Sequence, residues 1–202
     1  MIVIVDYGLG NIRAFANIYK SLGIDFAIVK DAAGLEKASH LVLPGVGAFD
    51  WAMQRLEASG MRPVLDNLVL NRQVPVLGIC VGMQMMANCS EEGKLAGLGW
   101  IQGRVKRFDS RLFSSKTSLP HMGWNDIAPN EHPLLAGILD PRFYFLHSYY
   151  FAPEFPEAAL AEAEYGQPFS AVVGNCHVLG VQFHPEKSHH WGIQLLKNFA
   201  KL

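Results

Sequence analysis

Short, uninterrupted apolar runs that alternate with helical patterns constrain the fold of this chain more than any other feature. The first run, Met1–Val5, ends at Asp6, and a later one, Val74–Ile79, ends at Cys80. Runs that are apolar on both faces are typical of strands buried between two layers of helices. We therefore expect an α/β fold with a mostly parallel sheet flanked by helices. The expected strands of this part are Met1–Val5, Ile24–Val29, His40–Leu43 and Val74–Ile79. The expected helical parts are a helix capped by Asn11, a short segment Ala32–Ala38, helical segments over roughly Phe49–Asn71 and a helix Val81–Asn88.

The second half of the chain has a different pattern, in which strand-like segments are joined by short turns. This pattern predicts an antiparallel extension of the sheet. Ile193, Leu196 and Phe199 recur on one helical face and indicate a closing helix. Because the chain has 202 residues and no linker-like segment, we expect residues 1–202 to form a single domain. The expected strands of this half are Ile101–Arg107, Arg142–Tyr150, Ala159–Tyr165, Ser170–Gly174 and His177–Phe183.

The charge balance and the N-terminal sequence argue against several classes of protein. A formal net charge of -1 gives no basis for binding nucleic acid or an anionic membrane. The N-terminus has neither the basic start nor the cleavage pattern of a signal peptide. The longest apolar stretch, from Val74 to Cys89, is shorter than the roughly 18 residues that a membrane span requires. We therefore expect a cytoplasmic protein without a membrane segment.

One cysteine has the surroundings of a nucleophile. Gly78 and Gly82 flank Cys80 at a predicted junction of strand and helix, which is the cysteine form of a nucleophile elbow. Such a turn exposes the sulfur above the sheet, and the helix N-terminus beside it favours the thiolate. The alternative is a buried cysteine between two packing glycines. Cys89 and Cys176 lack these glycines, so we expect them to be packing residues.

Two further segments supply the groups that a cysteine nucleophile needs. His184 follows a predicted strand, and Glu186 is close enough in sequence to orient the imidazole of His184. The glycine-containing segment after His40–Leu43 offers backbone N–H groups for an oxyanion. We expect one donor from Val81 and the other from Val46 or Gly47. Taken alone, each segment is better explained as an ordinary loop.

In this order and at these separations, the segments resemble the class I glutamine amidotransferases, which use a Cys-His-Glu triad. More narrowly, the whole chain resembles the glutaminase subunits of imidazole glycerol phosphate synthases. The resemblance covers the chain from Met1 to its end, and its combined motifs are highly specific. They are DYGLGNIR (6–13), PGVGAF (44–49), LGICVGMQ (77–84), LPHMGWN (119–125), YFLHSYY (144–150) and GVQFHPEKS (180–188).

The resemblance implies roles for individual residues and no cofactor. Cys80 would form a γ-glutamyl thioester with L-glutamine, His184 would transfer protons, and Glu186 would orient His184. The substrate-binding positions would be Gly47, Gln84, His147, Ser148 and Tyr149, and positions facing a partner would be Asn11, Tyr144 and Lys187.

The family also implies a partner, a (β/α)₈-barrel cyclase that uses the ammonia in histidine biosynthesis. A chain of 202 residues is shorter than the about 250 that such a barrel usually takes, so the cyclase must be a separate chain. In this family glutaminase activity is expected to be weak until the partner binds its substrate. Residues that depart from the family pattern, Val81, Trp100 and the His189–His190 pair, remove no catalytic group.

Other interpretations of the sequence remain open. A zinc site built from His184, Glu186 and the histidines at 189 and 190 is disfavoured, since neighbouring helical residues diverge by about 100°. A silent interaction module has no need of a full triad. A related subunit could deliver ammonia to a different barrel synthase, and its ammonia-producing residues would be identical. A free-standing cysteine hydrolase would need no partner.

Overall fold

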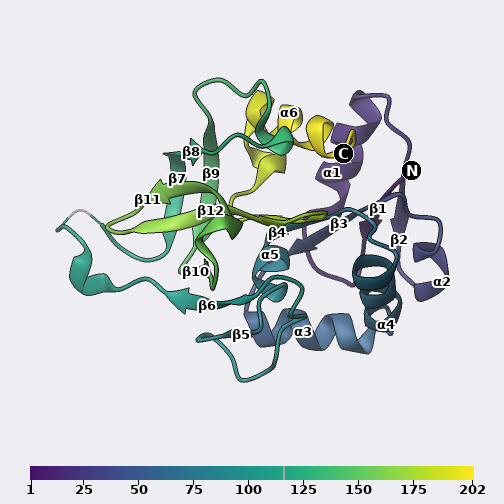
Figure 1. Ribbon diagram of the computed structural model, residues 1–202, viewed down its shortest axis with the longest axis horizontal. Coiled ribbons are helices and arrows are strands. Elements are labelled where there is room, and N and C mark those ends of the chain that lie inside the picture. Colours follow the sequence, from purple (N-terminus) through teal and green to yellow (C-terminus); the bar gives the residue numbers. More distant parts are fainter. Residues whose placement is uncertain (116) are drawn as a thin grey trace.

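A computed structural model describes residues 1–115 and 117–202 of the chain. Its centre is an eight-stranded sheet of order β2-β1-β3-β4-β13-β12-β11-β8 (Figure 1). The first five strands of this order are parallel, and the remaining neighbours pair antiparallel. The expected class of fold, a mostly parallel sheet between helices with an antiparallel extension, is therefore confirmed.

The strands and helices have the following bounds. The strands of the large sheet are β1 Ile2–Val5, β2 Phe26–Val29, β3 His40–Gly45, β4 Val76–Cys80, β8 Ala128–Pro129, β11 Ala159–Glu164, β12 Pro168–Asn175 and β13 Val178–Val181. The strands of the small sheets are β5 Cys89–Ser90, β6 Gly103–Arg107, β7 His121–Asp126, β9 Arg142–His147 and β10 Tyr149–Pro153. The α-helices are α1 Ile12–Ser21, α2 Ala32–Leu35, α3 Phe49–Ala58, α4 Arg62–Asp66, α5 Val81–Met85 and α6 His189–Phe199. Shorter turns are the π-helix η1 Asn67–Asn71 and the 3₁₀ turns η2 Ser110–Leu112, η3 Pro133–Leu135, η4 Pro156–Ala158 and η5 Pro185–Lys187.

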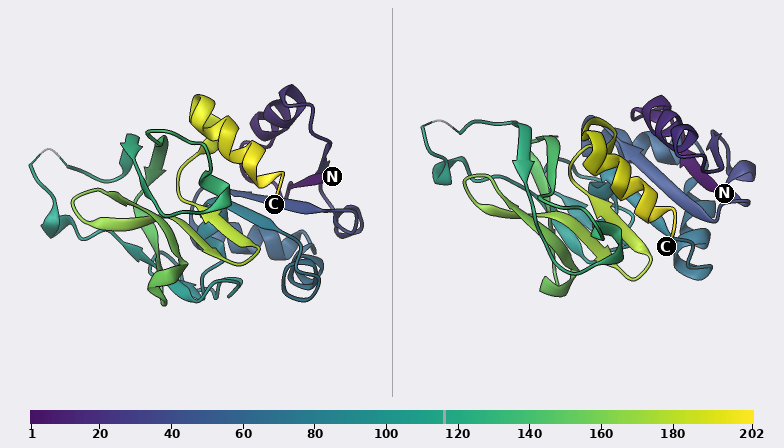
Figure 2. Two further views of the ribbon diagram at one scale, coloured as in Figure 1. Left: turned by 45° about the horizontal axis from the view of Figure 1, so that its top comes forward. Right: turned by 90° about the horizontal axis from the view of Figure 1, so that it is seen from above.

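Helices cover both faces of the parallel strands. Helices α1 and α6 lie side by side on one face, whereas α3 and α5 lie on the other (Figures 1 and 2). All residues of β1 and of β4 are buried, as expected for strands with helices above and below them. Within the described ranges, no helix is long and apolar enough to span a bilayer.

Local details of the first half differ from the expectation. Asn11 lies at the N-cap of α1, but its side chain makes no capping hydrogen bond. The helical segments expected over Phe49–Asn71 are α3, α4 and η1, and the break lies near Gly60, whose φ of 69° suits a glycine and ends the preceding helix. The expected helix Val81–Asn88 ends at Met85.

The antiparallel half corrects one prediction. Strands β6, β9 and β10 do not join the large sheet: β10, β6 and β5 form a three-stranded sheet, and β7 and β9 form a two-stranded one. The expected single strand Arg142–Tyr150 is two strands, because the chain changes partner at Ser148, from β7 to β6. Strand β7 was not predicted from the sequence. An alternating pattern continues across such a change of partner, so the sequence gives no sign of it.

Two glycines let the backbones of β3 and α5 touch. A Cβ atom on Gly45 would lie 2.2 Å from the nitrogen of Gly82. A Cβ atom on Gly82 would lie 1.9 Å from the carbonyl oxygen of Leu43. Real Cβ atoms do not approach backbone so closely, so both positions require glycine. This contact places the start of α5, and with it Cys80, directly over the end of β3.

The substitution Gly82→Ala tests this contact. We expect it to lower the free energy of unfolding by about 2–3 kcal/mol, because β3 and α5 must separate to admit the methyl group. Urea denaturation would measure the change. A suitable control is Gly60→Asn, since Gly60 has φ 69° and no atom within 4 Å of its added Cβ, and asparagine tolerates that conformation. A neutral Gly82→Ala variant would contradict the packing argument.

Candidate active site

Cys80 lies on a strained turn between β4 and α5. Its φ is 55° and its ψ is -113°, a conformation that is rare for a residue with a side chain. The residue is only 4% exposed, yet it contributes to the wall of a cavity. The turn therefore has the geometry expected of a nucleophile elbow, with the sulfur directed out of the sheet.

His184 and Glu186 are brought to Cys80 by the sheet. Strand β13 pairs in parallel with β4, so that Val181 is opposite Ile79, and both strands end at the same edge. The Nδ1 atom of His184 lies 3.1 Å from Oε1 of Glu186. Burial of the imidazole acts to lower the pKa of His184, but hydrogen bonds and charge interactions with Cys80 and Glu186 outweigh burial and raise the pKa to about 9. This environment favours the imidazolium form of His184.

A cavity of about 270 Å³ collects most of the predicted site residues. Three predicted residues do not line it: Glu186 is bonded to His184, while Asn11 and Tyr144 lie outside the cavity wall. The lining residues are Val46, Gly47, Cys80, Val81, Gln84, Glu92, Leu146, His147, Ser148, Tyr149, His184 and Lys187.

The predicted oxyanion segment is only partly a free loop. Pro44 and Gly45 belong to β3, and Gly45 is packed against α5. Gly47 has a φ of 84° and an open environment, and Val46 and Gly47 line the cavity. Val46 and Gly47 are therefore the part of this segment that lies beyond β3 and faces the cavity.

Glu92 lines the cavity and was not predicted. Its Oε2 accepts a hydrogen bond from the backbone nitrogen of Phe49 at 2.9 Å. Among the lining residues it is the only carboxylate, so it provides the negative charge that an ammonium group of a ligand would need. No sequence motif marks it, because it reaches the site from a turn outside the catalytic segments.

The side chain of Gln84 is largely engaged by the protein. Its Nε2 donates to the carbonyl oxygen of Tyr149 at 3.0 Å and to Oε1 of Gln182 at 3.1 Å. An amide nitrogen has two hydrogens, so both are used. Only the Oε1 atom of Gln84 has capacity left for a ligand in the cavity.

A buried pair of histidines supports the wall formed by residues 147–149. Nδ1 of His147 lies 2.8 Å from the carbonyl oxygen of Tyr149 and therefore carries a proton. Its Nε2 lies 3.0 Å from Nδ1 of His121, which must then be the donor. Burial lowers the pKa of His121 to about 4. Burial, with a smaller effect from His121, lowers the pKa of His147 to about 3. His121 is thus a buried support of the site.

Of the predicted partner-facing residues, Lys187 lines the cavity and Tyr144 lies next to it. The ammonium of Lys187 lies 5.6 Å from the ring centre of Tyr144, within the range of a cation–π contact. Asn11 is exposed at the start of α1, which contacts η5. Near them, the ring of His189 stacks on Trp124 at 5.2 Å. His189 and His190 are exposed residues of the first turn of α6, and no group of three metal-binding side chains occurs in residues 1–115 and 117–202.

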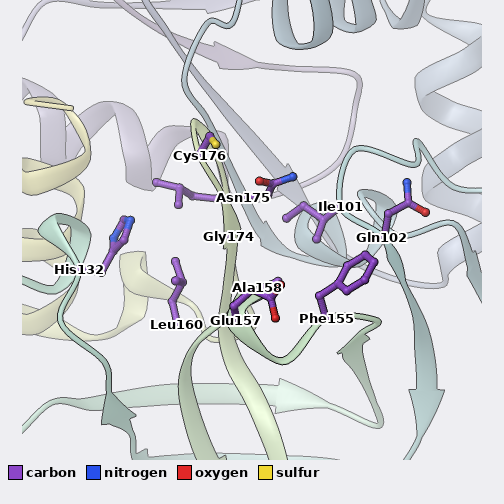
Figure 3. A pocket seen from close by; sticks show the side chains of 11 residues that line it. Ile101, Gln102, His132, Phe155, Glu157, Ala158, Leu160, Gly174, Asn175 and Cys176 are labelled. Atoms are coloured by element: carbon purple, nitrogen blue, oxygen red, sulfur yellow. The ribbon is translucent and has the colours of Figure 1, made fainter.

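A second cavity, of about 360 Å³, lies away from these residues (Figure 3). It is next to Asn175 and Cys176, which precede β13, whereas His184 follows that strand. The cavity therefore belongs to the opposite end of the parallel strands. Cys176 and Cys89 are exposed, so the prediction that they are packing residues was wrong.

Comparison with known proteins identifies the family. Residues 3–202 match the model of the glutamine amidotransferase class-I family. The chain belongs to this family. The chain is 55% identical to a Bdellovibrio bacteriovorus protein named imidazole glycerol phosphate synthase subunit HisH, and the match covers the whole length of both chains. A Leptospira interrogans protein of the same name is 48% identical, again over both whole chains. A solved structure described as a glutamine amidotransferase has a TM-score of 0.76, covers all of both chains and is 20% identical, which supports the fold.

The two buried histidines should make the chain sensitive to acid. Both pKa values lie below the ordinary value near 6.5. As the pH falls, the unfolded chain therefore binds protons at these residues before the folded chain does. Their contribution to stability is present above about pH 6.5 and is lost as the pH falls towards 4. The original chain should lose unfolding free energy between pH 7 and pH 4.5. We expect this loss to be smaller in His121→Phe, by on the order of 1–2 kcal/mol.

Urea denaturation at a series of pH values would measure this slope. His190→Ala, at an exposed position of α6, is the matched histidine control and should retain the slope of the original chain. An unchanged slope in His121→Phe would mean that His121 is not kept neutral by folding.

Proposed function

We propose that this chain is the glutaminase subunit of an imidazole glycerol phosphate synthase. It would hydrolyse L-glutamine to glutamate and ammonia and deliver the ammonia to a cyclase subunit. The observation that carries the proposal is the cavity in which Cys80, on its strained turn, meets His184 and the bonded Glu186. The relatives of 48–55% identity over their whole length support the choice of synthase.

The first half of the proposed reaction makes a thioester. The Cys80 thiolate attacks the side-chain amide carbon of glutamine and forms a tetrahedral intermediate. The backbone N–H of Val81, with that of Val46 or Gly47, would donate to its oxyanion. The intermediate collapses when the C–N bond breaks, and the imidazolium of His184 gives its proton to the departing nitrogen, which leaves as ammonia. Glu186 keeps the ring of His184 oriented throughout.

The second half restores the enzyme. Neutral His184 takes a proton from a water molecule as that water attacks the thioester carbon. Collapse of the second tetrahedral intermediate breaks the C–S bond and releases glutamate. The sulfur leaves as a thiolate beside the newly protonated His184, which is the pairing that raises the pKa of His184 in the free chain.

The charges of the cavity suit the amino-acid end of glutamine. The carboxylate of Glu92 would face the α-ammonium group, and the ammonium of Lys187 provides a positive charge on the same wall. Gly47 and the turn formed by His147, Ser148 and Tyr149 would hold the substrate backbone. The remaining acceptor of Gln84 would add a polar contact.

The proposed partner is a (β/α)₈-barrel cyclase on a separate chain. It would bind over the side that carries Asn11, Tyr144 and Lys187, so that ammonia passes directly from the cavity mouth to the second active site. We also propose that residues 1–202 act as one domain and that the complex is cytoplasmic, since a reactive free thiol persists best in a reducing compartment.

The test of this function is glutamate release from glutamine by the purified chain, alone and with the cyclase and its ribonucleotide ligand. We expect little release by the chain alone and a large increase in the complete mixture. If no increase occurs although the cyclase is active with ammonium, the proposed partnership is wrong. A different barrel synthase would then be the acceptor to examine.

The nucleophile is tested by Cys80→Ala. This variant should lose at least 10³-fold of glutamine-dependent synthesis, because the thioester cannot form. The cyclase in the complex should remain active with added ammonium. Cys89→Ala, which replaces an exposed cysteine, is the control and should retain full activity. Persistent glutamine hydrolysis by Cys80→Ala would show that another group is the nucleophile.

A further inference from the structure

Gln182 is a fully buried polar residue for which the reaction described above has no role. It lies between the end of β13 and His184, and its exposed fraction is 0%. Its Nε2 atom lies 3.8 Å from the sulfur of Cys80. A buried amide normally has a hydrogen-bonding task, because burying it without partners is unfavourable.

The orientation of the Gln182 amide follows from its neighbours. The carbonyl oxygen of Tyr149 can only accept, so the atom of Gln84 that faces it at 3.0 Å must be nitrogen. The second hydrogen of that nitrogen points to Gln182 at 3.1 Å, so the facing atom of Gln182 must be oxygen. The nitrogen of Gln182 is therefore the end directed at the sulfur of Cys80.

We propose that Gln182 is a further catalytic residue, whose amide N–H holds the sulfur of Cys80 in its anionic form. The inference rests on the proposed function, in which that sulfur is a thiolate before attack and again when glutamate leaves. Gln84 is a positioning residue in this arrangement, because it fixes which end of the Gln182 amide meets the sulfur.

The surroundings of the sulfur give this donor a specific task. The sulfur also lies 3.9 Å from the carbonyl oxygen of Leu146. A carbonyl accepts a hydrogen bond from a thiol but repels a thiolate, so this contact favours the protonated, unreactive form. The N–H of Gln182 opposes that preference. Unlike His184, which gives its proton to ammonia, the amide keeps its hydrogens in every step of the reaction.

The variant Gln182→Met tests the donor, because methionine has a similar volume and no N–H. We expect the rate of Cys80 alkylation by chloroacetamide at pH 7.5 to fall about tenfold, as a hydrogen bond to a charged group is lost. In the complex with the cyclase, kcat should fall by a similar factor, and KM for glutamine should change less than twofold. A role in packing alone would leave the alkylation rate unchanged.

A second variant, Gln182→Glu, keeps an acceptor for Gln84 and replaces the donor with a carboxyl group. The alkylation rate of this variant, divided by that of the original chain at the same pH, should decrease as the pH rises from 6 to 8.5, because an ionised carboxylate repels the thiolate. If the ratio of the alkylation rate of Gln182→Glu to that of the original chain does not change with pH, the proposal is overturned. A Gln182→Glu variant that is as reactive as the original chain would overturn it too. This second measurement also decides the matter if Gln182→Met does not fold.

The control is Gln194→Met, which removes an amide on α6 that is hydrogen-bonded to Asn198. It should leave the alkylation rate unchanged. Because alkylation needs neither glutamine nor the cyclase, it tests Gln182 separately from the proposed function. If the original chain does not release glutamate with its partner but Gln182→Met still lowers alkylation, the fault lies in the assigned function and not in the role of Gln182.

Discussion

The contact between the backbones of β3 and α5 is the constraint on which the site depends. Since Gly45 and Gly82 have no side chains, the two segments approach until only backbone atoms separate them. The start of α5 is thereby fixed relative to the end of β3, and Cys80, which immediately precedes α5, has a left-handed φ of 55°. The Val46–Gly47 segment and Cys80 are adjacent for this reason, although more than thirty residues of sequence separate them.

The second requirement is the parallel pairing of β4 with β13. This pairing crosses about a hundred residues of sequence and places His184 beside Cys80. The intervening residues include most of the antiparallel strands, the turn at Ser148 and the buried histidines His121 and His147. Cys80 and His184 thus follow two neighbouring strands of the large sheet, while residues 147–149 belong to the smaller sheets or join them.

Much of this arrangement could be predicted from the sequence, for physical reasons. Strands β1 and β4 contain only apolar residues, glycine and Cys80, and all of their residues are buried, so local pattern and tertiary burial agree. Motif spacing indicated Cys80, His184 and Glu186, and their proximity agrees with that expectation, although their catalytic roles stay a proposal.

The features that were missed depend on partners that are distant in sequence. Strand β7 is defined by its pairing with β9, and the division at Ser148 by a change of partner. His121 is notable for its hydrogen bond to His147, and Gln182 for its contact with the sulfur of Cys80. Glu92 reaches the cavity from an unrelated turn. Contacts of this kind follow from the folded geometry and leave no periodic signal in the chain.

The partner change at Ser148 has a mechanical consequence. The thiol is anchored in an eight-stranded sheet, whereas the wall at residues 147–149 joins the two-stranded and three-stranded sheets at one residue. The two sides of the cavity are therefore held by sheets of different size. A load on the outer face of the β7–β9 ribbon would reach residues 147–149 through Ser148, while Cys80 is held by the larger sheet.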